Sequence, residues 1–316
     1  MTRDSLQPVD PALTPRFADV ATLMRARRLD PQAGIDIALC GAPFDLGSNY
    51  RGGSRLAPAA LRTASRLMRL RHPTLGIAPF DICKIADVGD APVNPLDAAL
   101  SLSLMEAFFA TLVQNHSVPL VVGGDHTVPL PVLRALGNKQ PVGVVQFDAH
   151  PDTFDTLQGT RINHATTFRR AAEEGLIDPK RCIQIGLRGP MFSENDYQDS
   201  QSLGIRVINM DEYEQMGRAA VIEEIQKVTG EGPVYISFDI DALDPSEAIG
   251  TGVPEAGGLS VRDCQVMLRS LAGKNIVGGD ICEISPDLDP SGLTATNAAN
   301  LLFEMLCVTA SAVAAR

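Results

Sequence analysis

Two aspartates and a histidine stand close together in the stretch Asp148-Ala-His150-Pro-Asp152. The stretch follows Val142–Phe147, a short β-branched apolar run without the alternation of a half-exposed strand, which predicts a buried parallel strand. Ligands of open α/β sheets bind at the carboxyl ends of the strands, so the three side chains stand where a ligand would bind. Carboxylate and imidazole donors without thiolate suit Mn²⁺ or another borderline divalent ion better than a structural zinc. The competing interpretation is a solvated acidic turn.

Two further stretches carry the same residue types, and each follows a short apolar run. One is Gly123–Thr127, which contains His126, and the other is Ser237–Pro245, which contains Asp239 and Asp241. A lone histidine is most often a core residue, and an aspartate before proline is usually part of a turn. Three such coincidences at strand ends instead favour a set of donors that converge on one rim of a sheet, and therefore a metal site.

The elements that must position these groups alternate along the chain. Apolar runs separated by helix-length segments predict right-handed crossovers and a parallel sheet covered on both faces. We therefore expect an α/β fold, a three-layer α/β/α sandwich with an eight-stranded, mostly parallel sheet. The expected strands are Ile35–Cys40, Ile82–Ile85, Val118–Val122, Val142–Phe147 and the runs around Cys182, Ile205, Val234 and Ile276.

Helices are expected between these runs. Pro58 opens one that continues through Leu70, and a long one covers Asp97–Asn115 with apolar residues at Leu100, Leu104, Ala107, Phe108 and Leu112. Ser260 caps another, and Thr294–Ala314 closes the domain. Residues 1–33 carry four prolines and read as an N-terminal arm with at most one short helix around Phe17–Arg27. No composition break marks a linker, so residues 34–316 are expected to form one catalytic domain.

The composition of the chain limits the classes of protein to which it can belong. The 316 residues are 45% hydrophobic, enough for one large core, and their formal charge of −11 argues against a nucleic-acid or anionic-membrane partner. The six cysteines show no Cys-x-x-Cys spacing and several lie inside apolar runs, so we expect reduced core residues and a cytoplasmic protein. We find neither the apolar stretch of a signal peptide nor the ~18 uninterrupted apolar residues of a membrane span.

The three stretches together resemble the signature segments of the ureohydrolase family, which includes arginase, agmatinase, guanidinobutyrase and guanidinopropionase. They read GGDHT at 123–127, DAHPD at 148–152 and SFDIDALDP at 237–245. The similarity extends from roughly residue 8 to the C-terminus, and Gly89–Pro95 together with the chain length looks most like the bacterial guanidinobutyrases and guanidinopropionases. The resemblance implies the arginase-type fold and an arm that packs against a neighbouring subunit.

It also implies two Mn²⁺ ions per subunit, with Ni²⁺ or another divalent ion as an alternative. Carried over residue by residue, one ion would be held by His126, Asp148, Asp152 and Asp239, and the other by Asp148, His150, Asp239 and Asp241. Asp148 and Asp239 would bridge the ions. Asp152 would also pass a proton to the leaving amine as a general acid.

Other residues are expected at the substrate. Glu283 resembles the family glutamate that pairs with the guanidinium, and His164 resembles the histidine that shuttles protons at the entrance. Asn163 and Leu157 are also candidate substrate-binding residues, Leu157 at the tail. A substrate carboxylate could be recognised by Arg161 or by Arg51, although both could equally be solvated surface charges.

The sequence therefore predicts a binuclear-metal hydrolase that releases urea or a urea derivative from a small guanidino compound. The substrate would resemble guanidinobutyrate or guanidinopropionate, or be an atypical substituted guanidine or biguanide, because His164-Ala-Thr-Thr-Phe168 departs from the family's His-Gly-Thr-Pro-Phe. An agmatinase, a formiminoglutamase and a non-catalytic partner subunit are the alternatives. We expect a homo-oligomer, trimer or hexamer, formed through the arm and the last helix, with a hetero-oligomer possible.

Overall fold

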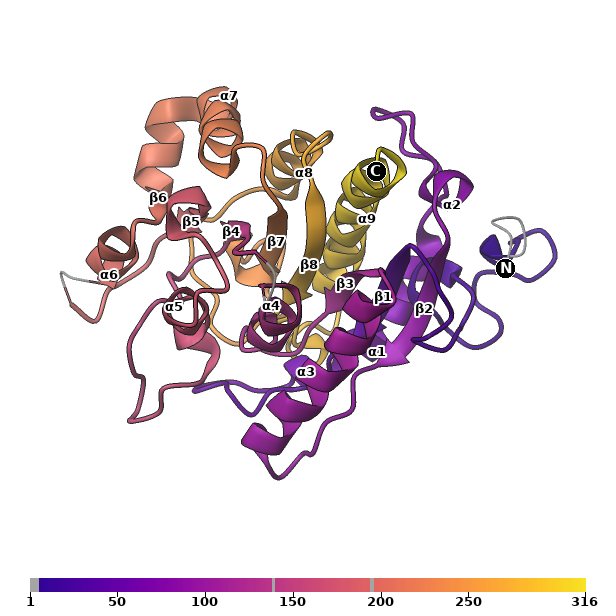
Figure 1. The fold of residues 1–316 in the computed structure, drawn as a ribbon, viewed down its shortest axis with the longest axis horizontal. Coiled ribbons are helices and arrows are strands. Elements are labelled where there is room, and N and C mark those ends of the chain that lie inside the picture. Colours follow the sequence, from indigo (N-terminus) through magenta and orange to yellow (C-terminus); the bar gives the residue numbers. More distant parts are fainter. Residues whose placement is uncertain (1–5, 138–139, 194–195) are drawn as a thin grey trace.

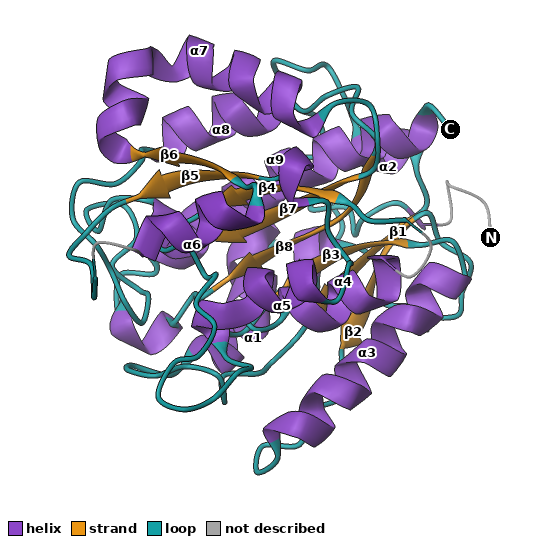
Figure 2. Cartoon of the chain, turned by 60° about the vertical axis from the view of Figure 1, so that its left-hand side comes forward, coloured by secondary structure: helices purple, strands orange, loops and turns teal. Residues whose placement is uncertain are grey.

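A single sheet of eight parallel strands runs through the centre of the molecule, and helices cover both of its faces (Figures 1 and 2). The computed structural model describes residues 6–137, 140–193 and 196–316. The strand order is β2-β1-β3-β8-β7-β4-β5-β6, and every pairing is parallel, which confirms the expected three-layer α/β/α sandwich. The strands are β1 (Ile37–Gly41), β2 (Ile85–Asp90), β3 (Val118–Val122), β4 (Gly143–Phe147), β5 (Ile183–Leu187), β6 (Arg206–Asn209), β7 (Val234–Asp239) and β8 (Ile276–Cys282).

The interior strands are buried along their whole length, except for half-buried Val277 in β8, which explains why they carry apolar runs. One helical layer packs α3 against α4 and α4 against α5, and the other packs α9 against α1, α2 and α8 (Figure 2). Each face of the sheet has its own apolar core. The helices are α1 (Ala57–Ala64), α2 (Pro79–Ile82), α3 (Ala98–Gln114), α4 (Pro129–Gly137), α5 (Thr167–Glu173), α6 (Asp196–Leu203), α7 (Met210–Thr229), α8 (Val261–Arg269) and α9 (Leu293–Ala314).

The expected helices are present, but two details differ. The helix opened by Pro58 ends at Ala64 and continues only as a 3₁₀ turn over Ser65–Leu67. In α3 the buried face is formed by Ser101, Leu102, Met105, Phe109 and Leu112, so of the stripe expected from the sequence only Leu112 is fully buried. Because α3 is apolar on most of its circumference, its spacing alone does not select the face that meets the core.

The segment before β2 was assigned wrongly. The sequence predicts a strand over Ile82–Ile85, whereas the structure has the short helix α2 up to Ile82 and begins β2 at Ile85. Pro79 stands in the first turn of α2, where its missing N–H costs no hydrogen bond. The strand therefore lies three residues further along the chain.

The N-terminal arm contains no α-helix in its described part. The segment Leu23–Arg25 forms only a 3₁₀ turn, and two of its backbone N–H groups bond outside the arm: Leu23 N–H donates to Asp87 Oδ2 at 2.9 Å and Met24 N–H donates to Ser65 Oγ at 2.9 Å. The following residues run beside β2, where Asp87 N–H donates to the carbonyl of Arg27 at 3.0 Å and Leu29 N–H donates to the carbonyl of Asp87 at 3.1 Å. The arm thus covers one edge of the sheet.

Helix α9 is the one helix in the described part of the chain that is long and apolar enough to cross a membrane by length and composition. Of its most apolar window, 67% is buried inside the protein, where it packs on β8, α1 and α8. Its apolar surface therefore belongs to the core.

Gly124 fixes the loop that leaves β3. A Cβ atom at this position would overlap the carbonyl group of Phe44, because Asp125 N–H donates to that carbonyl at 2.8 Å. The carbonyl of Gly124 in turn accepts from Glu283 N–H at 2.8 Å. The close approach of three backbone segments leaves no room for a side chain.

We predict that Gly124→Ala lowers the free energy of unfolding by about 3 kcal/mol or more, because the overlap is with backbone rather than with a flexible side chain. Urea unfolding followed by circular dichroism measures it. Gly52→Ala is the matched control, since its added Cβ would meet only Asp45 Oδ2 at 3.5 Å. Equal midpoints for the two variants would contradict the packing argument.

Candidate metal centre

Four neighbouring strands at the centre of the sheet, β3, β8, β7 and β4, deliver the candidate ligands to one rim. His126 follows β3, Asp148 follows β4, Asp239 ends β7 and Glu283 follows β8. Parallel strands end on the same side, so residues more than a hundred positions apart in the sequence lie together. All six predicted ligands meet here.

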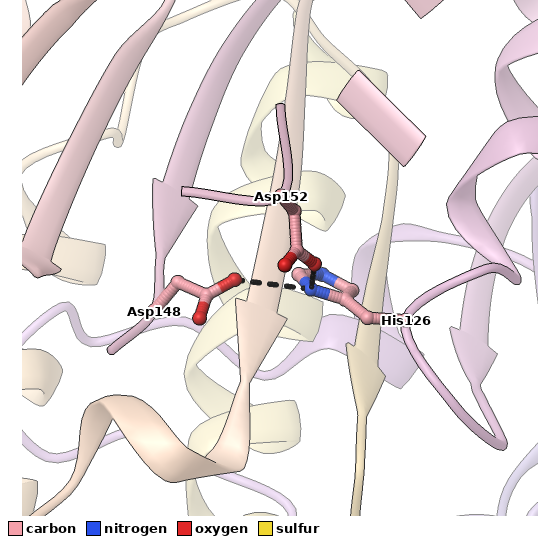
Figure 3. Close-up of side chains that lie close together, drawn as sticks. All are labelled: His126, Asp148 and Asp152. Atoms are coloured by element: carbon pink, nitrogen blue, oxygen red, sulfur yellow. Dashed lines mark ion pairs between the residues drawn. The ribbon is translucent and has the colours of Figure 1, made fainter. Parts of the chain in front are cut away.

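The first group surrounds the Nδ1 atom of His126 (Figure 3). This nitrogen lies 2.8 Å from Asp152 Oδ2, 3.1 Å from Asp148 Oδ2 and 3.4 Å from Asp239 Oδ2. His126, Asp148 and Asp152 are buried and form a compact set that could hold one metal ion. Asp239 falls outside that compact set, although its oxygen faces the same nitrogen.

The second group lies on the other side of Asp148. His150 Nδ1 is 3.0 Å from Asp241 Oδ2 and 3.7 Å from Asp148 Oδ1. Asp148, His150 and Asp241 form a second compact set that could hold an ion. Asp148 therefore presents one oxygen to each group, which is the arrangement that a bridging carboxylate requires.

The state of His126 fits a metal ligand. Its Nδ1 atom is buried and has no hydrogen-bond partner in the described part of the chain, despite the three carboxylates nearby. Its Nε2 atom lies 2.9 Å from Ser237 Oγ, and that hydroxyl donates to Asp280 Oδ1 at 3.0 Å. A hydroxyl that donates to Asp280 can accept only from Nε2–H, so Nδ1 is the atom left for a metal ion. Burial lowers the pKa of His126, but Asp148 and Asp152 outweigh it and raise that pKa well above its usual range, so a bound cation would displace the Nδ1 proton.

The buried carboxylates of the site would also be stabilised by bound cations. Burial and then repulsion from Asp152 and Asp241 raise the pKa of Asp148 to about 7, and burial and the charge of Asp241 raise the pKa of Asp239 well above its usual range. For Asp241 burial acts in the same direction, but His150 outweighs it and lowers the pKa to about 2. So many buried carboxylates are stable as anions only with bound positive charge.

Glu283 and His164 form a pair beside this cluster. Glu283 Oε1 accepts from the backbone N–H of His126 at 2.9 Å and lies 3.0 Å from His164 Nδ1, while His164 Nε2 lies 3.0 Å from Asn49 Oδ1. Burial opposes protonation of His164, but the hydrogen bond and the charge of Glu283 outweigh it and raise the pKa of His164 to about 9. Glu283 itself has a left-handed backbone with φ of 63°, as has Asp152 with φ of 50°. Such strain is typical of residues held for a function.

A cavity of about 140 Å³ opens above the cluster. Three of the residues expected at the substrate, Leu157, His164 and Glu283, line it together with the candidate ligand Asp152. Its remaining lining residues are Asn49, His150, Phe154, Ala165, Pro190, Phe192, Asp239, Asp241, Val253 and Glu255. The cavity wall is thus partly polar, where the candidate ligands line it, and partly apolar, at Phe154, Leu157, Pro190, Phe192 and Val253.

The other expected substrate residues lie outside this cavity. Arg161 is 59% exposed and pairs with Glu173 and Asp155, so its guanidinium is held on the surface. Arg51 donates from Nε to the carbonyl of Gly252 at 2.9 Å and from Nη2 to the carbonyl of Thr251 at 3.0 Å. Neither arginine lines the cavity, and both use their guanidinium groups in contacts within the chain.

Asn163 has a structural role instead of lining the cavity. Its Oδ1 accepts from Ala165 N–H at 3.1 Å, while its backbone N–H donates to Thr166 Oγ1 at 3.0 Å. These bonds cap the 3₁₀ turn over His164–Thr166. The Thr167 hydroxyl donates to the carbonyl of His126 at 2.7 Å, which ties the turn to the metal site.

Two groups of residues were not anticipated from the sequence. Ser237 and Asp280 orient His126, and the presence of an aspartate inside the apolar run of β8 is the signal that could have indicated a buried partner. Phe192 and Val253 line the cavity. Their position there follows only from the path of their loops.

Comparisons with known proteins agree with this geometry. Residues 35–307 match the arginase family. The chain is 45% identical to the guanidinopropionase of Pseudomonas aeruginosa over 99% of both chains, and 39% identical to the guanidinobutyrase of the same organism over 98% of both. Among solved structures, it is similar to proclavaminate amidino hydrolase from Streptomyces clavuligerus, with a TM-score of 0.90, 36% identity and coverage of 95% of this chain and all of the other.

We predict that Asp148→Asn removes both metal ions, because Asp148 belongs to both groups, whereas His150→Ala removes one. Elemental analysis after gel filtration should find about two ions per chain in the wild type, nearly none in Asp148→Asn and about one in His150→Ala. Asp155→Asn is the control, as this carboxylate lies on the surface close by. Two ions retained by Asp148→Asn would show that it does not bridge.

A second prediction concerns pH in metal-free protein. The pKa of His164 is about 9 when folded against a usual 6.5, so its contribution to stability is complete below pH 6.5 and is lost as the pH rises through 9. The difference in unfolding free energy between wild type and His164→Gln should therefore shrink by up to about 3 kcal/mol between these pH values. Urea titrations in the presence of a chelator measure it, and a difference independent of pH would contradict the assignment.

Proposed function

The chain belongs to the arginase family, and from that membership we propose that it hydrolyses a small alkyl-substituted guanidine at a centre of two Mn²⁺ ions. That it is a guanidino hydrolase follows from the family and from its relatives. The proposal that the substrate carries an alkyl substituent rests on one observation, the apolar wall of the cavity that Asp152 and Glu283 also line.

The reaction needs a strong nucleophile, because resonance spreads the charge of a guanidinium and makes its carbon a poor electrophile. Two divalent ions in the two groups that share Asp148 would lower the pKa of water and supply hydroxide near neutral pH. Imidazole and carboxylate donors without thiolate support Mn²⁺, with Ni²⁺ as the alternative ion.

The protein's own groups bind the guanidinium and move protons. Glu283 Oε1 already accepts from His126 N–H, and Oε2 has no hydrogen bond to any described residue, so Oε2 is free to accept from a guanidinium N–H in a charge-assisted bond. Asp152, which lines the cavity, takes the proton released by the attacking water. Asp152 then passes that proton to the departing amine as the C–N bond breaks, and His164, which also lines the cavity, exchanges protons with solvent.

The apolar part of the cavity wall favours a substrate with an uncharged alkyl substituent. Phe154 and Phe192 meet there edge to face with ring centroids 6.0 Å apart, and Leu157, Pro190 and Val253 complete the wall. No lysine or arginine of the described residues lines the cavity. A carboxylate would lose its hydration against this wall without gaining a partner, which costs several kcal/mol. An N-alkylguanidine or an alkyl-substituted biguanide suits it better than a guanidino acid.

An amine-tailed guanidine such as agmatine is the second candidate. Glu255 lines the cavity, 24% exposed at its side chain and 4.0 Å from His150 Nε2. Its carboxylate would attract a substrate ammonium group and repel a carboxylate. Both the apolar wall and the Glu255 carboxylate therefore disfavour a substrate with a carboxylate tail.

We further propose a homo-oligomer in the cytoplasm. The described part of the arm exposes Leu13, Phe17 and Val20 at more than 80% each, which supports burial against another subunit. All six cysteines are buried thiols, which supports a reducing compartment.

The proposal is tested by urea release from a substrate panel by the Mn²⁺-loaded enzyme. We expect kcat/KM for butylguanidine, dimethylguanidine or a dimethylated biguanide to exceed that for guanidinopropionate and guanidinobutyrate by about tenfold or more, because a desolvated carboxylate costs over 1 kcal/mol. Agmatine and arginine complete the panel. A wild type that prefers a guanidino acid would refute the proposed substrate.

A reversal experiment sharpens the test. Leu157→Arg introduces a cation into the cavity wall and should raise the ratio of kcat/KM for guanidinobutyrate to that for butylguanidine, while Leu157→Met keeps the wall apolar and should leave the ratio unchanged. An unchanged ratio in Leu157→Arg would show that the substrate tail does not reach Leu157.

A further inference from the structure

Three arginines converge on a small cavity in the N-terminal arm, away from the metal centre. Arg16 and Arg25 belong to the arm, and Arg66 belongs to the 3₁₀ turn that follows α1. The cavity measures about 30 Å³, room for one or two water molecules or for one carboxylate or phosphate head group. Figure 1 shows the arm in indigo beside β2, at the opposite end of the sheet from α6 and α7.

The guanidinium of Arg25 lacks a partner. The residue is only 8% exposed, and its Nε and Nη1 atoms are buried without a hydrogen bond to any residue that the structure describes. Arg16 Nε is buried and unpartnered in the same way. Arg16 and Arg25 line the same cavity, and burial and then the charge of Arg16 lower the pKa of Arg25, although the charge of Asp10 acts in the opposite direction. An unpaired buried charge is costly, and native proteins normally pair it.

Arg66 does not neutralise this charge but holds the arm in place. Its Nη1 donates to the carbonyl of Arg16 at 3.3 Å and its Nη2 donates to the carbonyl of Asp19 at 2.6 Å. The carboxylate of Asp19 accepts from Val20 N–H at 2.7 Å and forms no ion pair within the described chain. The cavity is therefore lined by three cations and one carboxylate, that of Asp19, and its net charge is positive.

Arg25 is also held at a conformational cost. Met24 and Arg25 both have left-handed backbones, with φ of 55° and 58°. Two buried neighbours, Leu23 and Met24, anchor the turn in the core, and Val9 N–H donates to the carbonyl of Arg25 at 3.2 Å. Left-handed non-glycine residues cost about 1 kcal/mol or more each and persist where the surroundings enforce them.

We propose that the cavity formed by Arg16, Arg25 and Arg66 is a binding site for one oxyanion head group, a carboxylate or a phosphate. Guanidinium donors match the paired oxygens of such groups, and charge-assisted bonds would satisfy the buried Nε and Nη1 atoms. The head group has two possible sources, a free anion or an acidic side chain of a second copy of this chain. Leu13, Phe17 and Val20 lie exposed on the same arm, and the chain carries 38 acidic residues, so a second copy offers both apolar contact and carboxylates.

The test compares wild type with Arg25→Met and Arg16→Met, which remove one cation while keeping side-chain bulk. Arg27→Met is the matched control, because Arg27 is an exposed arginine of the same arm that does not line this cavity. Thermal unfolding is measured in inorganic phosphate and in chloride at equal ionic strength. Sedimentation velocity is measured over a range of protein concentrations. Arg16 is half-buried, so its variant keeps the test usable if Arg25→Met fails to fold.

If the source is a free anion, phosphate raises the melting temperature of wild type and of Arg27→Met above the value in chloride, and the rise disappears in the two cavity variants. If the source is a second copy, the wild type self-associates and the two cavity variants weaken that association by about 30-fold or more, as expected for loss of one member of a buried charge pair. The proposal is overturned if neither readout distinguishes the cavity variants from wild type. It is also overturned if Arg27→Met changes both readouts equally, since the effect would then be one of net charge.

Discussion

The structure depends on gathering negative charge at one buried rim. Asp148, Asp152, Asp239 and Asp241 approach one another there with two imidazoles between them, an arrangement that repels itself unless cations bind. Parallel strands make it possible, since all eight point the same way and the ends of β3, β8, β7 and β4 are neighbours. The apolar cores on both faces of the sheet supply the stability that holds these groups together. The left-handed backbones of Asp152 and Glu283 lie at the same rim.

Much of the fold could be predicted because burial on both faces imposes a simple pattern. Strands such as Val118–Val122 and Gly143–Phe147 are apolar without interruption, and the segments between them are long enough for helices. The pattern fails where local sequence does not decide the outcome. The arm near Leu23 follows hydrogen bonds to distant Asp87 and Ser65 instead of forming a helix. In α3 apolar residues on several sides left the buried face ambiguous.

The candidate site, like the fold, could be predicted from the sequence only in part. His126 and Asp148 could be recognised because metal chemistry restricts the residue types and strand ends fix their place. The walls of the cavity could not, since Phe192 and Val253 come from loops whose paths depend on the whole fold. For Arg161 the sequence leaves two interpretations open, a substrate contact near His164 and a solvated surface charge, and in the structure neighbouring acids hold it at the surface.

The pairing of residues 27–29 with β2 has a consequence for how copies of the chain can meet. An edge strand with free N–H and C=O groups is a template on which another chain can add a strand. Here β2 is such an edge, and the arm occupies it: Arg27 and Leu29 bond to Asp87, and Arg28 pairs with its side chain at 3.3 Å. The arm therefore occupies the backbone groups of Asp87, so a strand of another copy cannot pair with the edge of the sheet at that residue.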